Sequence, residues 1–354
     1  MVIALCVFSF AVLLPLIAKE HKKLAISVSF VALFVFLAIR CDFGNDYQNY
    51  ERIHWIIQNK GMMSRWLTYS GCEAYSFLNF LFKDFYVMIA FISFLYCYIV
   101  YRLITNNCDK RYWALSIFIL TFNPYILLVQ ASSLRQTMAI LVFIVAVDFA
   151  YKKNIIAYFC LIYLASLFHS SAVVLYPVYF LLCFDWKESF VLAVIMCALM
   201  VILSGSAVTS FVGDVSGSVI GQGKTENYMV GENSVRATIL SSLYLLFMLF
   251  AYPEAEEKDA IYLRLGIVSA LCAVVALRVA MFTRIQMYFE IFTIVAIPVA
   301  FKSIKAPKFF LLSNELYRFL WIALLIIIYF LRVYSFFTNP TWESFVEYQT
   351  IFQR

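Results

Sequence analysis

Long apolar runs separated by short polar breaks recur along the whole chain. Twelve of them are long enough to span, or nearly span, a bilayer: 1–18, 24–39, 85–104, 112–130, 135–151, 154–168, 172–184, 189–206, 237–252, 261–282, 285–301 and 314–333. A perpendicular spanning helix needs roughly 20 apolar residues, so the run 172–184 is short. The pattern predicts an all-α polytopic membrane protein with about twelve transmembrane helices, folded as a single transmembrane domain over residues 1–354.

Composition supports a membrane protein and argues against a nucleic-acid-binding one. Of the 354 residues, 64% are hydrophobic and 14% are charged, whereas a soluble globular chain is about half apolar and a quarter charged. The net charge of +6 does not indicate nucleic acid, because no basic run is interleaved with aromatic residues. The first apolar run has neither a basic start nor a small-residue cleavage site, so we expect a retained helix.

The polar loops predict the orientation of the chain in the membrane. Successive polar loops fall on opposite sides of the membrane. The loops on one side carry most of the lysines: 19–23, 106–111, 152–153, 185–188, 253–259 and 302–308. The positive-inside rule assigns that side to the cytoplasm. Both termini then face out, and the outer, periplasmic side holds residues 40–84, 207–236 and the tail 335–354.

Lysines and arginines separate between the two sides of this predicted topology. Eleven of the 14 lysines lie at or near the cytoplasmic side, and nine of the 13 arginines lie at the outer side. Arginine binds phosphate through a planar fork and stays charged when partly desolvated. Snorkelling to the interface explains Arg332 and Arg354. Four others end otherwise apolar segments, where we expect a shared anionic ligand: Arg40, Arg135, Arg278 and Arg284.

The outer segments differ in character. The sequence YQNYERIHWII (47–57) places Tyr47, Tyr50, Ile53 and Ile57 on one helical face, which is typical of an amphipathic helix in the membrane interface. Residues 207–236 hold five of the chain's ten glycines and form either a lid over an outward-facing cavity or a slack connector.

Two cysteines flank the first outer segment. They are Cys41 and Cys72, and an oxidising compartment would permit a disulfide between them.

The sequence RCDFGNDYQNY (40–50) gathers charge directly after an apolar run. Asp42 and Asp46 follow Arg40, with Gly44 between them to permit a tight turn. Either these charges pair with one another at a helix end, or one aspartate orients or activates a ligand.

Three further outer positions are candidates for catalysis. Glu73 precedes a short apolar segment, and Glu290 lies inside an apolar run, where an unpaired acid is costly. Glu290 is therefore paired with an arginine such as Arg278 or Arg284, or is functional. His169, followed by two serines, either caps a helix or acts as a base, since imidazole titrates near neutral pH.

Arg135 and Gln136 begin an apolar run at the outer side, a suitable place to hold an anionic head group. No metal-binding D-x-D, phosphate-binding loop, dinucleotide fingerprint or metal-spaced Cys/His cluster occurs in the sequence. A cytoplasmic nucleotide-driven enzyme is therefore disfavoured, and a lipid-activated donor used on the outer face, without a cofactor, fits better.

Four segments in order resemble the EpsG-like and Wzy-type family of polysaccharide polymerases. They are R…FGNDYQNY (40–50), EAYSFLNFLF (73–82), LRQTMAIL (134–141) and FHSSAVVLYPVYFL (168–181). Asn45 and Ala74 depart from the family's pattern without removing a charged group. The C-terminal half matches mainly in hydropathy, so expectations for Arg278, Arg284 and Glu290 rest on their own charges.

The resemblance implies a bacterial inner-membrane glycosyltransferase of GT-C-like helical architecture with an outward-facing cavity. It would join O-antigen or capsule repeat units carried on undecaprenyl pyrophosphate, among membrane lipids and with a chain-length regulator of the Wzz type as a partner. A sugar hydroxyl attacks the anomeric carbon of the growing chain and the lipid pyrophosphate departs. Arginines would neutralise the leaving group, with Arg40 holding phosphate or a neighbouring acid.

The base that activates the sugar hydroxyl stays open at this point. His169 and Asp46 rank nearly level and Glu73 third. Tyr47 and Tyr50 are suited to stacking on sugar rings beside Asp46.

Three other functions compete with the polymerase. An O-antigen ligase uses the same donor and is favoured by a large periplasmic loop near the C-terminal third. A lipid-linked oligosaccharide flippase or transporter would need a central charged cavity, whereas the charges here crowd the outer rim. A membrane acyltransferase would take its donor from the cytoplasm, against the outward placement of His169.

Overall fold

A computed structural model describes the chain except for residues 19, 62–71, 184–243, 278–280, 307–312 and 354. The chain forms two compact units, one of Met1–Cys183 with Arg332–Arg354 (unit 1) and one of Phe184–Leu331 (unit 2). The expected spans at 189–206 and at the start of 237–252, and the glycine-rich segment 207–236, lie outside the described residues. The single-domain organisation stays a prediction.

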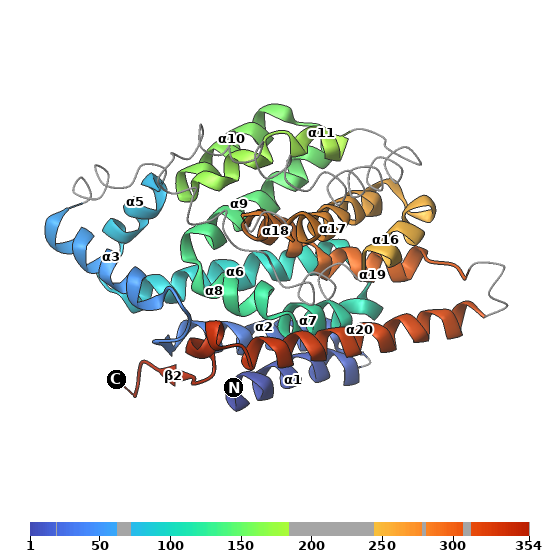
Figure 1. The fold of residues 1–354 in the computed structure, drawn as a ribbon, viewed down its shortest axis with the longest axis horizontal. Helices are drawn as coiled ribbons and strands as arrows, with labels where there is room; N and C mark the ends of the chain where they lie inside the picture. The colour runs from blue at the N-terminus through green and yellow to red at the C-terminus, as the bar shows by residue number, and fades with distance from the viewer. Residues whose placement is uncertain (19, 62–71, 184–243, 278–280, 307–312, 354) are drawn as a thin grey trace. The chain divides into compact units, whose positions relative to one another are not determined.

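Unit 1 is an assembly of helices (Figure 1). In chain order they are α1 (Val2–Ile17), α2 (Lys22–Ala38), α3 (Tyr47–Lys60), α5 (Glu73–Leu81), α6 (Phe85–Asn107), η1 (Lys110–Tyr112), α7 (Trp113–Phe122), the π-helix η2 (Tyr125–Val129), α8 (Gln130–Ser132), α9 (Leu134–Tyr151), α10 (Ile155–Phe168), η3 (Ser170–Leu175) and α11 (Val178–Cys183). The end of α20 (Asn314–Phe337) and η6 (Pro340–Phe345) complete it. The expected spans in this part of the chain are largely helical, although 172–184 is a 3-10 helix followed by the short helix α11, and 112–130 is interrupted.

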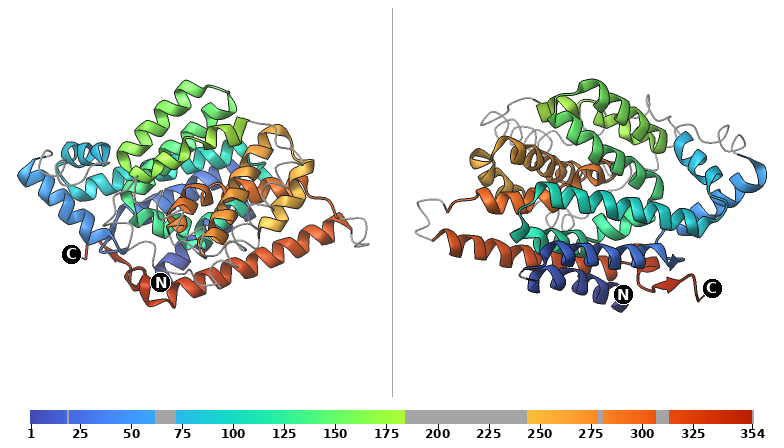
Figure 2. Two further views of the ribbon diagram at one scale, coloured as in Figure 1. Left: turned by 45° about the horizontal axis from the view of Figure 1, so that its top comes forward. Right: turned by 180° about the vertical axis from the view of Figure 1, so that it is seen from behind.

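Neighbouring long helices of unit 1 run antiparallel. Helix α2 packs against α1 and α6, and α9 packs against α10 across a three-residue turn. The amino group of Met1 donates to the carbonyl of Val346, so the start of the chain and its C-terminal tail meet (Figure 2). The end of α2 and the starts of α6 and α9 share that end of the unit, which we call the motif end.

The C-terminal tail packs on the segment that follows α2. Strand β1 (Arg40–Cys41) pairs antiparallel with β2 (Gln349–Thr350), with Arg40 opposite Thr350. Tyr348 stacks on Phe36 at a ring-centroid distance of 4.5 Å, and burial raises its pKa to about 12. The sequence predicts an outer tail but not this pairing, because the partners lie about 310 residues apart.

Two expected spans are broken rather than straight. In unit 1, Lys110–Phe122 and Tyr125–Ser132 meet at 67°, where Pro124 supplies no backbone donor and a π-turn follows. In unit 2, α18 (Phe282–Glu290) and α19 (Thr293–Ser303) meet at 59°. The Thr293 hydroxyl donates to the carbonyl of Glu290 at 2.7 Å, which diverts that carbonyl from the helical ladder.

The number of spans is not confirmed at twelve. Within the described residues, three helices are long and apolar enough to cross a membrane, α6, α9 and α20, or up to five if each bent pair counts as one span. Three shorter apolar helices, Val2–Ile17, Ile155–Phe168 and Ser170–Cys183, add to them. The protein is therefore a multi-pass helical membrane protein.

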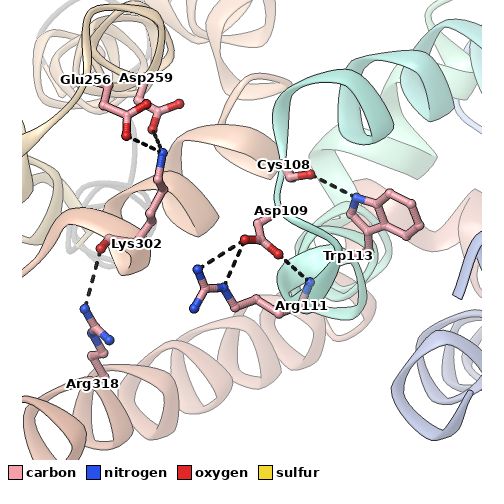
Figure 3. A network of polar contacts seen from close by, with 8 residues as sticks. All are labelled: Cys108, Asp109, Arg111, Trp113, Glu256, Asp259, Lys302 and Arg318. Atoms are coloured by element: carbon pink, nitrogen blue, oxygen red, sulfur yellow. Dashed lines mark hydrogen bonds and ion pairs between the residues drawn. The ribbon is translucent and has the colours of Figure 1, made fainter. Parts of the chain in front are cut away.

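Unit 2 is built around α17 (Glu257–Val275), which packs against α16 (Tyr244–Ala251), α18 and α19. A Cβ on Gly266 would lie 2.6 Å from Met248 Sδ and 2.9 Å from Ala296 Cβ, so these helices approach closely only because of this glycine. The short helix η4 (Tyr252–Glu254) leads into α17. At its polar end, Lys302 Nζ contacts Asp259 at 2.9 Å and Glu256 at 3.0 Å (Figure 3).

Arg40 ties the helices of the motif end together from inside. Its side chain is 2% exposed. The guanidinium donates to the carbonyl of Leu37, to Ser93 Oγ at 3.1 Å and to the carbonyl of Ala131 at 2.8 Å. Burial lowers its pKa to about 10, which leaves it charged at neutral pH. Arg40 was expected to hold phosphate or an acid, but among the described residues it binds carbonyls and a hydroxyl instead.

Replacing Arg40 by lysine should destabilise the protein. Lysine keeps the charge, but a single ammonium cannot reach acceptors on α2, α6 and α8 together, and each buried polar group left unpaired costs about 1–3 kcal/mol. We expect thermal unfolding in detergent several degrees below wild type. Arg52→Lys, on the exposed face of α3, is the matched control and should unfold like wild type. Equal unfolding temperatures for the two variants would contradict the claim that the Arg40 guanidinium holds α2, α6 and α8 together.

Candidate functional site

The segments of the chain that carry the sequence candidates converge at the motif end of unit 1. The loop after α2 leads into α3, and α3 packs against α5, which contacts α10. Helix α10 ends where α9 begins, because the two form an antiparallel hairpin. Asp46, Glu73, Arg135 and His169 therefore lie at one end of the same helical assembly.

The loop between α2 and α3 is seated on the break before α9. Gly44 adopts a φ of +112°, and a Cβ there would lie 2.5 Å from Ser132 Oγ. Two residues on, the backbone N–H of Asp46 donates to the same Oγ at 3.2 Å. On its other side, the Gly44 N–H donates to the Ser344 carbonyl of the tail at 3.2 Å. Ser132 and the tail together fix where Asp46 begins α3.

Arg135 is the central cation of this end. Its Nη1 lies 3.1 Å from Cys72 Sγ, and its guanidinium carbon lies 5.8 Å from the centre of the Tyr50 ring. Burial raises the pKa of Tyr50, so its phenol stays protonated beside the cation. Arg135 Nε is buried and has no hydrogen-bond partner among the described residues. The guanidinium of α9 thus contacts one side chain from α3 and one from the residue that precedes α5.

Two carboxylates flank this arginine cluster. Asp46 is the N-cap residue of α3, yet its side chain makes no capping hydrogen bond, and it is half-buried. Glu73 is the first residue of α5, directly after Cys72, and is also half-buried. Asp46 begins α3, four residues before Tyr50, and Glu73 directly follows Cys72, so both acids lie close in the sequence to residues that contact Arg135. Their roles toward a ligand stay predictions.

His169 is engaged as a cap. It ends α10, and its Nδ1 lies 2.7 Å from Ser171 Oγ and 3.4 Å from the Ser171 backbone N–H, which it accepts at the start of η3. The helix-capping interpretation therefore describes its geometry. With Nδ1 accepting, a neutral imidazole carries its proton on Nε2, which suits a donor better than a base.

The tyrosines of α3 do not face a ligand. Tyr47 is 3% exposed and Tyr50 is 4% exposed. Tyr47 meets Phe85 at a ring-centroid distance of 5.4 Å, and Tyr50 meets Tyr75 at 5.5 Å. The expected apolar face is correct, but the protein's own helices cover it rather than lipid or a sugar ring. Gln136 is likewise buried, at 5% exposure, and does not lie open to a head group.

The candidates in unit 2 are placed separately. Arg278 lies outside the described residues. Arg284 is exposed on α18. Glu290 is 3% exposed and accepts a hydrogen bond from Gln286 Nε2 at 3.3 Å. Their roles in ligand binding stay predictions.

Two other sequence features are a permitted disulfide and an arginine expected at the interface. The permitted disulfide between Cys41 and Cys72 does not form: both are free thiols, and Cys72 contacts Arg135. The expectation for Arg332 is wrong. Arg332 does not snorkel: it is 3% exposed, and its guanidinium carbon lies 5.3 Å from the centre of the Tyr125 ring. Arg354 lies outside the described residues.

Sequence reasoning missed three contributors to this end, Cys72 as a partner of Arg135, Ser132 and the C-terminal tail. Ser132 precedes the predicted Arg135 by three positions, and its only sequence signal is a polar break inside apolar runs. Within the described ranges, no group of three or more His, Cys, Asp or Glu side chains is arranged to hold a metal.

Comparison with known proteins gives one result for nearly the whole chain. A family model described as the EpsG family matches residues 23–350. That range includes every segment converging at the motif end. No curated protein and no solved structure gives a match.

Gly44→Ala should abolish function, because the added Cβ collides with Ser132 and strains a positive φ. Gly61→Ala is the matched control. Gly61 also has a positive φ, +78°, but among the described residues no atom lies within 4 Å of its Cβ position. Surface polysaccharide made by each variant, at equal protein level, measures the effect. We expect little or no polymer for Gly44→Ala and near-normal polymer for Gly61→Ala. Normal polymer from Gly44→Ala would show that the loop need not sit on Ser132.

Proposed function

Since the chain belongs to the EpsG family and is a polysaccharide-polymerase-like membrane protein, we propose that it polymerises lipid-linked repeat units at the periplasmic face of the inner membrane. The donor is a growing glycan on undecaprenyl pyrophosphate, and the acceptor is a single lipid-linked unit. The product is an O-antigen or capsular polysaccharide. The observation that carries the proposal is the cluster around Arg135, with two carboxylates beside it.

The chemistry needs charge neutralisation more than acid catalysis. An acceptor hydroxyl forms a bond to the anomeric carbon of the donor, and the bond from that carbon to the lipid pyrophosphate breaks. Pyrophosphate leaves readily once its charge is balanced by fixed donors. Arg135 presents a guanidinium that lies beside Tyr50 and Cys72, and its Nε has no hydrogen-bond partner among the described residues. A fork of this kind matches two phosphate oxygens.

The hydroxyl proton has to go to a base on the same side. Asp46 is the best candidate, because it begins α3 about one turn before Tyr50, whose ring faces Arg135, and its backbone is fixed by Ser132. Glu73 stands beside the Arg135 cluster as the second candidate. His169 ranks below both, since its Nδ1 already binds Ser171.

Deletion of the gene tests the function as a whole. If the protein is a polymerase, cells without the gene should still carry single repeat units on the surface acceptor, but no polymer. Surface acceptor without any repeat unit would instead support a ligase, and loss of all exported units would support a flippase.

Arg135→Lys should reduce polymer formation about tenfold or more, although the charge is kept. Lysine loses the planar fork, and a hydrogen bond to a charged group contributes roughly 1.5–3 kcal/mol. The assay is purified protein with lipid-linked repeat units, and Arg52→Lys is the control. Full-length polymer at the wild-type rate from Arg135→Lys would refute its role at the leaving group.

Asp46→Asn should slow turnover about 100-fold or more with the fold intact, because removing a general base typically costs at least that. Asp42→Asn is the matched control in the same loop. Asp42 has a φ of +49°, which asparagine tolerates, so this variant should remain active. His169→Ala is expected to lose less than Asp46→Asn. If Asp46→Asn stays within tenfold of wild type, the assignment fails and Glu73→Gln becomes the decisive variant.

A further inference from the structure

A polar cleft lies at the other end of α6, far from Arg135. Its volume is about 720 Å³, and it is lined by the start of α2, the last turns of α6 and the segment leading into α7. From Phe85 at the motif end to Thr105 in the cleft, α6 rises about 30 Å at 1.5 Å per residue. The cleft is therefore separate from the proposed catalytic end. It lies on the side that the positive-inside rule assigns to the cytoplasm.

Three cations line the cleft, Lys23, Arg102 and Lys110. All three are exposed. In the part of the chain that the structure describes, none of them forms an ion pair; Arg102 Nη1 contacts only the Tyr98 hydroxyl, at 3.3 Å. Long cationic side chains repel one another when gathered around one cleft, unless an anion sits between them.

The one acid in the lining is already engaged. Asp109 accepts the backbone N–H of Arg111 at 3.0 Å, and its other oxygen binds the Arg111 side chain at 3.1 Å (Figure 3). The backbone hydrogen bond from Arg111 lowers the pKa of Asp109, so the carboxylate is ionised but turned to its own neighbour. The positive charges of the three cations that line the cleft are therefore not neutralised by this carboxylate.

Topology and helix dipoles do not account for this arrangement. The positive-inside rule requires cations on this side but not around a common cleft. The negative end of α6 favours Arg102 near its C-terminus. Lys23, however, lies in the first turn of α2, at the positive end of a helix with no acidic residue in that turn, where the dipole disfavours a cation.

We propose that the cleft of Lys23, Arg102 and Lys110 is a binding site for a phosphate-bearing anion, separate from the proposed polymerase site. An arginine fork and two ammonium groups match the oxygens of a phosphate monoester or diester. Two sources share that chemistry: the headgroup of an anionic phospholipid, since basic pockets between transmembrane helices bind such headgroups, and a free phosphate.

Binding to the full-length protein in detergent tests the site. The probes are dioctanoyl phosphatidylglycerol, which is anionic, dioctanoyl phosphatidylcholine, which carries no net charge, and inorganic phosphate. We expect saturable binding of phosphatidylglycerol that weakens with salt, and at least tenfold weaker binding by Arg102→Gln/Lys110→Gln. Competition by millimolar inorganic phosphate would also support the anion site and assign it to a free phosphate.

The matched control is Lys152→Gln/Lys153→Gln, which removes two cations from another loop of the same side without touching the cleft. It should bind like wild type, and thermal unfolding should confirm that both double variants are folded. Three results would overturn the site: equal loss of binding in both double variants, no loss in the cleft variant, or equal binding of phosphatidylcholine and phosphatidylglycerol.

Discussion

The guanidinium of Arg40 is the interaction on which the motif end depends. It joins the end of α2, the middle of α6 and the break before α9 through the carbonyls of Leu37 and Ala131 and the hydroxyl of Ser93. A buried cation is costly without compensation, and here backbone carbonyls supply most of it. Because Arg40 and Gly44 are four positions apart, the same anchor sets where the loop can meet Ser132. Where the loop sits then decides where Asp46 and Tyr50 lie.

The motif of residues 40–50 is therefore mostly architectural. Arg40 points inward, Gly44 permits close approach to Ser132, and Tyr47 and Tyr50 pack against aromatic rings of neighbouring helices. The C-terminal tail covers the other side of the loop through β2 and the stacking of Tyr348 on Phe36. The proposed chemistry then falls to Asp46, Glu73 and the Arg135 cluster.

Hydropathy predicts the positions of the helices well, because each apolar run has to form its own backbone hydrogen bonds in lipid. It also finds the apolar face of α3. A periodic pattern does not say what covers a face, so Tyr47, Tyr50 and Arg40 were expected to meet a ligand and instead meet protein. The break at Pro124 has a sequence signal, whereas the break at Thr293 depends on one hydroxyl. The pairing of the tail with β1 has no sequence signal, since it joins residues at opposite ends of the chain.

The same limit applies to the candidate site. Residue types and spacing single out Asp46, Glu73 and Arg135, and the structure brings their segments together. They leave open whether His169 caps a helix or acts as a base, and they do not reveal that Cys72 contacts Arg135, because both depend on side-chain direction. Each of these differences changes the expected chemistry: His169 loses rank as a base, and Arg135 becomes a positioned fork rather than a charge at a helix end.

The most direct test is a cryo-electron microscopy structure of the protein with an undecaprenyl-pyrophosphate-linked repeat unit bound. The account predicts density for the pyrophosphate within hydrogen-bonding distance of Arg135, with the sugar directed toward Asp46 or Glu73. Pyrophosphate bound elsewhere, with Arg135 still held only by Tyr50 and Cys72, would contradict it.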